Sequence, residues 1–205
     1  TTPTSSQFDL SVYFHNSGNT TLNSGLVRTA TSPAGTSWER PDVGGNDSLS
    51  FAKNSYVVYA QSRTNGPNEI FGRLIRADTR TIGSATQLPL IAAGNRFFRT
   101  QPRITRKVSS TSSWIATWME RDSNIANDDW DIFAARISSV GQRQGVVRIT
   151  TESGPRLDKY NPAVAGWRGG YMIAYARSAN ITQGGQNIIT QRLDWGTATP
   201  PRVGP

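Results

Sequence analysis

The sequence predicts an all-β fold built from a repeated unit of four strands, and three observations support this. Only 36% of the 205 residues are hydrophobic, while 19 are glycine and 11 are proline, which is typical of short strands and frequent turns. The apolar runs are short and bounded by turn-forming residues, and none approaches the ~20 residues of a membrane-spanning helix. A pattern of prolines, aromatic residues and apolar segments also recurs three times along the chain.

The repeat has a constant order of features and a nearly constant period. Each unit opens on a proline followed two residues later by Val or Ile, and the prolines are Pro41, Pro102 and Pro162, 61 and 60 residues apart. An apolar segment with two aromatic residues follows, at 56–60, 114–118 and 171–176. A further apolar segment comes next, at 68–75, 130–137 and 186–193. A polar turn and a short fourth segment close each unit, so that one period contains four strands.

The aromatic segments are predicted to be strands buried on both sides. Trp114 and Trp118 are four positions apart, and two residues with this spacing lie on the same face of a strand. The residues between them are mostly apolar too, as expected where both faces are covered. A spacing of four also fits one face of a helix, but runs of about five residues are too short for one. We expect the proline of each unit at the start of its first strand.

Four strands per period describe one blade of a β-propeller, in which four-stranded sheets surround an axis. The predicted boundaries are a polar linker at 1–7, a half blade with its connection at 8–40, and blades at 41–101, 102–161 and 162–205. The half blade supplies only a third and a fourth strand. We therefore expect about three and a half blades, completed by a partner or by a longer parent chain. The alternative is a four-bladed or open β structure whose first blade is irregular.

The residues that carry the repeat resemble those of a known family. In the second unit they are Pro102, Trp114, Trp118, Asp131, Ile132, Phe133 and Arg136, and in the third Pro162, Tyr171, Tyr175, Asn187, Ile188 and Arg192. This pattern resembles the blade repeats of exported bacterial β-propeller proteins and covers most of residues 40–205. The resemblance implies export to the periplasm or the extracellular space and a scaffold or ligand-binding role. It implies no catalytic residues, and the strict Asp-box of sialidases is absent.

The charge and cysteine content narrow the range of partners and sites. The net charge of +8 comes mainly from arginine, with lysine only at Lys53, Lys107 and Lys159. Arginine suits two-pronged contacts with carboxylate, sulfate or phosphate groups, although a genomic bias toward arginine codons explains the composition equally well. The chain contains no cysteine, which excludes disulfides, thiolate metal sites and cysteine nucleophiles.

A basic and aromatic segment at 96–107 is the candidate ligand-binding site. Its candidate residues, together with a tryptophan from the following loop, are Arg96, Phe97, Phe98, Arg99, Arg103, Arg106 and Trp130. Basic residues interleaved with aromatic ones can bind single-stranded nucleic acid, but an anionic polysaccharide or an acidic protein surface is favoured for an exported protein. The alternative is that the two phenylalanines fill a gap between blades while the arginines stay in water.

An acidic loop at 122–131 is the candidate metal site. Calcium binds several carboxylate and carbonyl oxygens of one flexible loop, and the oxygen-bearing candidates are Asp122, Asn124, Asn127, Asp128, Asp129 and Asp131. A plain solvated turn is the alternative, because Asn and Asp are favoured in turns. No other cofactor is predicted.

These observations favour a non-catalytic, exported binding or scaffold module whose partner is a protein subunit, either itself or another protein, or a surface glycan. A carbohydrate-active enzyme is the first alternative, since acids are present at Asp42, Glu69, Glu120, Asp122 and Asp131. Glu69 and Asp131, however, occupy equivalent repeat positions, which favours a structural role. The single histidine, His15, has no nucleophile motif to accompany it. The second alternative is a purely structural subunit of a larger assembly.

Overall fold

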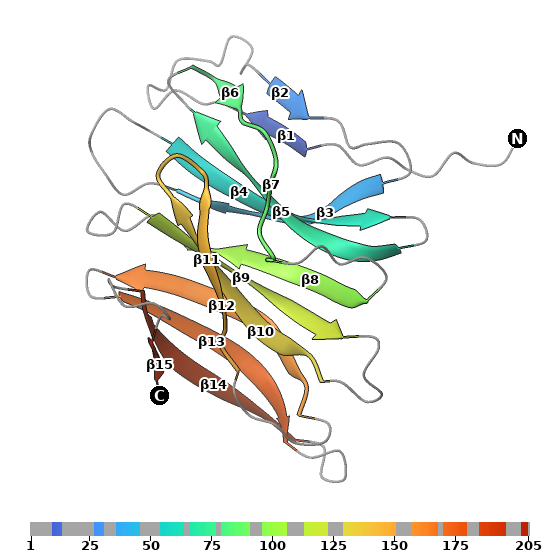
Figure 1. Ribbon diagram of the computed structural model, residues 1–205, viewed down its shortest axis with the longest axis vertical. Helices are drawn as coiled ribbons and strands as arrows, with labels where there is room; N and C mark the ends of the chain where they lie inside the picture. The colour runs from blue at the N-terminus through green and yellow to red at the C-terminus, as the bar shows by residue number, and fades with distance from the viewer. Residues whose placement is uncertain are drawn as a thin grey trace, which may run out of the picture.

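The computed structural model describes residues 10–13, 27–30, 36–45, 54–63, 66–76, 79–90, 96–105, 113–122, 129–150, 157–167, 170–179, 185–195 and 202–204, and every statement below concerns these residues. Their regular structure is entirely β-strand, in antiparallel sheets that lie one below another (Figure 1). The prediction of an all-β fold is confirmed. A helix able to cross a membrane is not found in these ranges.

A strand pair and a first sheet form the upper part of Figure 1. The pair consists of β1 (Leu10–Tyr13) and β2 (Val27–Ala30), which lie in the segment predicted to supply two strands. The first sheet has the order β3-β4-β5-β6, with β7 also paired to β5. Its strands are β3 (Thr36–Gly44), β4 (Asn54–Arg63), β5 (Gly66–Arg76), β6 (Thr81–Ile82) and β7 (Thr86–Gln87).

Two further sheets repeat this arrangement, each with four strands in simple up-and-down order. The second sheet contains β8 (Phe97–Ile104), β9 (Ser113–Asp122), β10 (Asp131–Ser138) and β11 (Arg143–Arg148). The third contains β12 (Lys159–Trp167), β13 (Gly170–Ala179), β14 (Gly185–Asp194) and β15 (Arg202–Gly204). The period near 60 residues therefore corresponds to one antiparallel sheet.

The repeat proline lies inside the first strand of each sheet and not at its start. The pairing with the second strand is interrupted there by a bulge, for example between Thr100 and Arg103 in β8. The residues before the three prolines have positive φ angles of 51° to 52°, and they are Arg40, Gln101 and Asn161. Proline cannot donate to the ladder, and an edge strand with a bulge is where a sheet tolerates it. Each sheet therefore begins a few residues before its proline.

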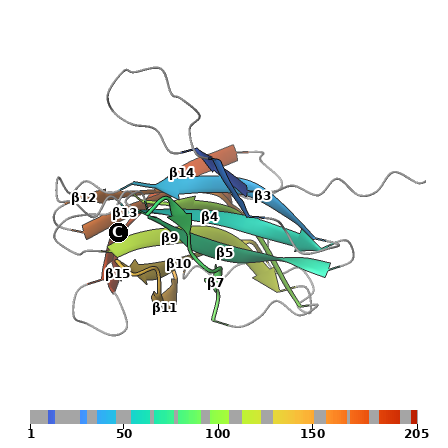
Figure 2. The same ribbon diagram turned by 90° about the horizontal axis from the view of Figure 1, so that it is seen from above.

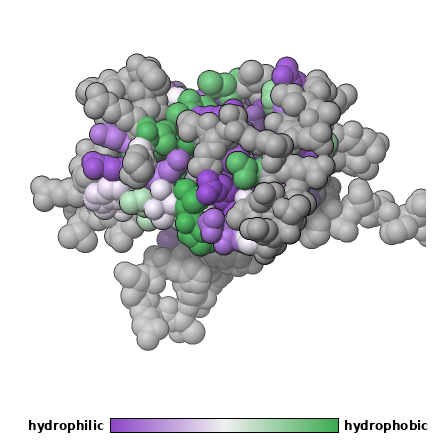
Figure 3. Space-filling model, turned by 90° about the horizontal axis from the view of Figure 1, so that it is seen from below, coloured by the Kyte–Doolittle hydropathy of each residue, from purple (hydrophilic) through white to green (hydrophobic). Residues whose placement is uncertain are grey.

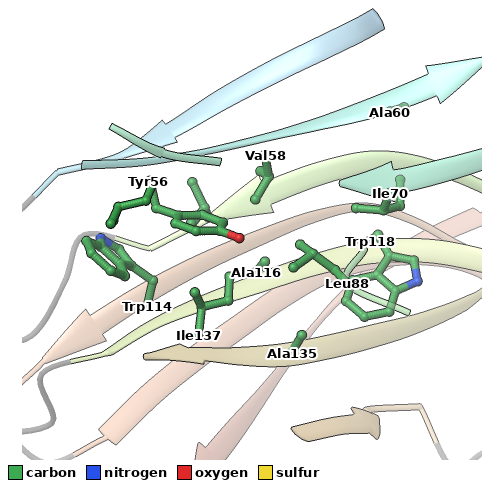
Figure 4. Packing of buried hydrophobic residues seen from close by; sticks show 12 residues of the cluster. Tyr56, Val58, Ala60, Ile70, Leu88, Trp114, Ala116, Trp118, Ala135 and Ile137 are labelled. Carbon is green, nitrogen blue, oxygen red and sulfur yellow. The ribbon is translucent and has the colours of Figure 1, made fainter. Parts of the chain in front are cut away.

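The sheets are stacked through apolar faces. Strand β8 contacts β3, β4 and β5 of the first sheet, and β12 contacts β8, β9 and β10. Viewed from above, the long strands β4, β5 and β9 overlie one another (Figure 2). Between the first two sheets, Tyr56 and Leu88 pack with Trp114, Trp118 and their neighbours (Figure 4). A second cluster joins the other face of the second sheet to the third.

The two tryptophans of β9 share one face, as predicted, whereas the tyrosines of the first repeat do not. Trp114 and Trp118 both lie in the cluster against the first sheet. Tyr56 lies in that same cluster, but Tyr59 packs on the opposite face, beneath β1. The spacing of three between the tyrosines explains the difference, because residues an odd number apart point to opposite sides of a strand. When the three repeats are aligned on their bulges, Tyr59 takes the position of an aromatic residue of the later repeats, and Tyr56 does not.

The outer face of the third sheet carries exposed apolar side chains. Met172, Ala176 and Ile188 share this face, since Ala176 lies directly opposite Ile188 in the register. Ile188 is 71% exposed, and Trp167 and Met172 are also exposed. Seen from below, this end of the molecule shows hydrophobic and hydrophilic residues side by side (Figure 3). No other sheet in the described ranges covers this face.

Truncation of the tryptophan at the interface of the first two sheets tests this packing. Trp114 is fully buried, and its Nε1 donates to the Gly45 carbonyl oxygen at 3.0 Å. We expect Trp114→Ala to lower the free energy of unfolding by about 3–5 kcal/mol, because it leaves a cavity and an unpaired carbonyl. The exposed Val140→Ala should change it by less than about 0.5 kcal/mol. Chemical denaturation measures both, and a loss below about 1 kcal/mol for Trp114→Ala would contradict this packing.

Candidate functional site

Most of the predicted binding residues gather at one end of the second sheet. Strand β8 begins, β9 ends and β10 begins at this end, because neighbouring strands are antiparallel. Phe98 lies opposite Arg121, and Asp131 lies opposite Glu120. The basic and aromatic segment is therefore brought next to both ends of the acidic loop, although residues 123–128 of that loop lie outside the described ranges.

An exposed arginine is held between two aromatic rings at this end. The guanidinium of Arg121 lies 5.1 Å from the ring centre of Phe98 and 4.9 Å from that of Trp130. Such contacts attract a cation to the face of the ring. Arg121 makes no hydrogen bond or ion pair with any residue that the structure describes. Its N–H groups are thus available to a ligand, while the rings restrict its motion.

Arg96 and Phe97 have different roles from Arg121. Arg96 is exposed and pairs with Asp122, with its Nε 2.6 Å from Oδ2. It also lies over the ring of Phe97, at 4.9 Å. The hydrogen bond and charge of Asp122 raise the pKa of Arg96 above its usual value. The charge of Arg96 is therefore already matched within the protein.

Arg99 is buried between two carboxylates and does not form part of the surface. Its Nε lies 2.7 Å from Glu120 Oε2, and its Nη1 lies 2.8 Å from Glu69 Oε2 on the first sheet. Trp118 Nε1 donates to the same Glu120 oxygen at 3.1 Å, and Gln87 donates to Glu69 at 3.3 Å. The assignment of Arg99 to ligand binding is corrected accordingly: its guanidinium joins two sheets.

Asp131 forms the corresponding link between the second and third sheets. Its Oδ1 accepts from Thr150 at 2.6 Å and lies 3.4 Å from the buried Lys159 ammonium, while Oδ2 lies 2.5 Å from Arg148. Arg99 and Lys159 each lie three residues before their repeat proline. Each reaches an acid near the start of the third strand of the preceding sheet. The equivalence of Glu69 and Asp131 thus corresponds to a repeated ion pair.

The acidic side chains in the described part of this loop already contact other groups of the protein. Asp122 pairs with Arg96, Asp131 with Lys159 and Arg148, and Asp129 accepts the Leu157 amide at 3.0 Å. The described ranges contain no group of three or more acidic or histidine side chains that could hold a metal. The remaining calcium candidates are outside these ranges, and they are Asn124, Asn127 and Asp128. The calcium site stays a prediction.

A tyrosine of β12, Tyr160, and the aspartate directly before this strand, Asp158, complete the surroundings of Trp130. Asp158 Oδ1 accepts the Trp130 backbone amide at 3.0 Å, and its Oδ2 accepts the Tyr160 hydroxyl at 2.7 Å. Partial burial, together with Asp158, raises the pKa of Tyr160 to about 12. The Tyr160 hydroxyl therefore remains protonated and keeps its hydrogen bond over the physiological pH range. This bond holds the Asp158 carboxylate in place, and that carboxylate in turn holds the Trp130 backbone amide.

The remaining candidate binding residues lie away from this surface or outside the described ranges. Arg103 is exposed and donates to the adjacent Pro102 carbonyl oxygen at 3.3 Å, and Arg106 is outside the described ranges. Sequence reasoning did not select Arg121. Its position directly opposite Phe98 could be inferred only from the strand register, which one sequence does not supply.

A scan against family models and searches of curated proteins and of solved structures gave no match. The function of this surface therefore has to be argued from its own geometry.

The link at Asp131 can be tested with a pair of substitutions. Asp131→Leu should lower the free energy of unfolding by about 3–5 kcal/mol, because it leaves the Lys159 ammonium buried without its acid. Adding Lys159→Met should recover most of this loss, since an apolar pair of similar volume replaces the charges. Thermal and denaturant unfolding of both variants and of Lys159→Met alone measure the coupling. Additive losses in the double variant would argue against a direct pair.

Proposed function

We propose that the protein is a non-catalytic, exported module of β-propeller type, and that it binds an anionic polysaccharide through Arg121, Phe98 and Trp130. The observation that supports this proposal is the state of the Arg121 guanidinium. It is exposed, it lies between two aromatic rings, and it makes no hydrogen bond to any described residue. A planar guanidinium presents paired donors that match the oxygens of a carboxylate or sulfate. Its fixed position lowers the ordering entropy that a ligand would otherwise have to offset.

The propeller assignment is supported by the repeated relation between sheets. Three successive sheets have the same up-and-down order, and the first strand of each contains the same proline bulge. Successive sheets pack face to face. In a propeller each blade covers its neighbour in this way. We therefore treat each four-stranded sheet as one blade.

A binding role is also supported by the contacts that the carboxylates make within the protein. Glycosidases use two carboxyl groups that flank a cleft. Glu69 and Glu120 instead share Arg99, and Asp131 is paired with Lys159 and Arg148. Asp42 accepts the Ile104 backbone amide at 2.9 Å. Each of these contacts gives the acid a structural use, which favours binding over a carbohydrate-active enzyme.

Polyanion binding by a matched pair of variants tests the proposal. Heparin and polygalacturonate serve as probes, with dextran as the uncharged control. Arg121→Gln should weaken binding of an anionic probe about 10-fold or more, as expected for the loss of charge-assisted hydrogen bonds. Arg76→Gln makes the same change of net charge at an exposed residue of β5 and should alter binding about two-fold or less. Titration calorimetry at two salt concentrations provides the measurement.

Two outcomes of that experiment would reject the anion site. Equal weakening by both variants would mean that only the net charge of +8 attracts the polymer. Dextran binding as strong as heparin binding would remove the need for a charged ligand.

A structural subunit of a larger assembly is the second candidate, and the outer face of the third sheet favours it. Large exposed apolar patches commonly mark interfaces. If this face is covered by a second copy, sedimentation should show a species heavier than a single chain. Ile188→Lys should then shift it to the mass of one chain, because a charge would be buried in the contact. A wild-type protein that sediments as one chain at all concentrations would exclude self-association.

A further inference from the structure

The outer face of the third sheet corresponds in the repeat to two faces that are buried inside the molecule. Each sheet has one isoleucine near the start of its third strand with an apolar residue directly opposite in the second strand. These pairs are Ile70 with Ala60, Ile132 with Met119, and Ile188 with Ala176. Ile70 packs between the first and second sheets and Ile132 between the second and third, and both are fully buried. Ile188 completes the series and is 71% exposed.

A second position on this face shows the same correspondence. Tyr56, Ile115 and Met172 each lie four residues before the residue that is opposite the isoleucine. Tyr56 and Ile115 are fully buried in the contact with the following sheet, whereas Met172 is 38% exposed. Ala165, directly opposite Met172 in the register, is exposed as well. This outer face therefore has the apolar residues of a sheet-to-sheet contact, and no sheet in the described ranges covers it.

Each of the two internal contacts joins unlike faces. The face turned toward the preceding sheet carries two aromatic residues four positions apart, Trp114 and Trp118 in the second sheet and Tyr171 and Tyr175 in the third. The face turned toward the following sheet carries the isoleucine of the third strand. The outer face of the third sheet is of this second kind. By continuity with the internal contacts, we expect it to meet a face of the first kind and not a copy of itself.

Among the described residues, two faces at the ends of the stack have no covering sheet. One is the outer face of the third sheet, and the other is the face of the β1–β2 pair that is turned away from the first sheet. Leu10 is buried against the first sheet, whereas Ser11, the next residue of β1, is exposed. The β1–β2 pair and the third sheet lie at opposite ends of the molecule (Figure 1). A contact between these two unlike faces therefore joins two copies of the chain.

The charges fit this arrangement. At both internal contacts, an acid directly before the isoleucine pairs with a base three residues before the proline of the following sheet. Glu69 pairs with Arg99 at the first contact, and Asp131 pairs with Lys159 at the second. The third sheet has the neutral Asn187 at this position. The β1–β2 pair contains no counterpart of the first strand that supplies the base, so that this contact does not need the ion pair.

We propose that the outer face of the third sheet binds the β1–β2 pair of a second copy, in the way that each sheet binds the next within the chain. Such a contact is heterologous, and it forms a ring where the rotation between copies closes. This inference rests on the second candidate function above, because it names the partner of that face, and it is independent of the anion site at Arg121.

Introduced thiols test the order of the two faces, and the natural absence of cysteine makes them specific. Ile188→Cys and Ser11→Cys each place one thiol on one of the two faces. A mixture of the two full-length variants, one of them isotope-labelled, is treated with a short bismaleimide and analysed by mass spectrometry. We expect mixed pairs of chains, and no cross-link in either variant alone. Val140→Cys, at an exposed turn residue, replaces Ser11→Cys in the matched control and should give none.

The outcomes separate this inference from the candidate function on which it rests. Cross-linking of Ile188→Cys with itself as strong as that of the mixture would overturn the order of faces, although self-association would stand. No mixed pair above the Val140→Cys control would also overturn it. Wild-type protein that sediments as one chain at all concentrations would reject both the inference and self-association.

A change of charge at Asn187 tests the correspondence with the internal contacts. Asn187→Asp should weaken self-association about 10-fold or more, because the contact would bury an acid without a base. Asn187 is exposed in the single chain, so that the thermal stability of dilute protein should stay unchanged. Gln144→Glu makes the same change of net charge at an exposed residue of β11 and should alter association about two-fold or less. Equal effects of the two variants in sedimentation would overturn the proposed contact.

Discussion

The constraint on which the rest of this structure depends is that the middle sheet is apolar on both faces. Trp114, Ala116 and Trp118 of β9 pack toward the first sheet, while Ile115 and Met119 pack toward the third. Each large side chain of this kind gains about 1.5–3 kcal/mol from burial. Uncovering either face would therefore remove an amount comparable with the whole net stability of a domain, about 5–15 kcal/mol. Strand β9 can be stable only between two neighbouring sheets.

Apolar faces alone do not fix how one sheet is placed on the next, and the buried ion pairs supply a directional contact. Arg99 and Lys159 come from the same repeat position, and each reaches an acid of the preceding sheet. Shifting a sheet along its neighbour would leave these charges buried without partners, which is strongly unfavourable. The pairs thus favour one placement, and this placement brings Glu69, Arg99 and Glu120 together between the first two sheets.

The sequence predicted the repeat well because its period depends on residue types that have few structural uses. Proline at 61- and 60-residue intervals matched the bulges, and the short apolar segments matched the strands. The roles of individual side chains were harder to predict. Arg99 was assigned to the surface because its charge and its aromatic neighbours suggested exposure. Only the sheet packing shows that Glu69, 30 residues earlier in the chain, lies beside it. Likewise, Tyr56 and Tyr59 lie on opposite faces of β4, although both belong to the aromatic segment of the first repeat.

Alternation along two strands separates the proposed anion site from the buried ion pair. Phe97 and Phe98 are neighbours in β8, yet Phe97 lies beside Arg99 and Glu120 while Phe98 holds Arg121. In β9 the adjacent Glu120 and Arg121 are divided between the same two faces. Because successive side chains of a strand point to opposite sides, one face uses its charges in an ion pair and the other presents Arg121 to solvent. The overall charge of +8 therefore does not describe the proposed anion site, which depends on the placement of a single arginine.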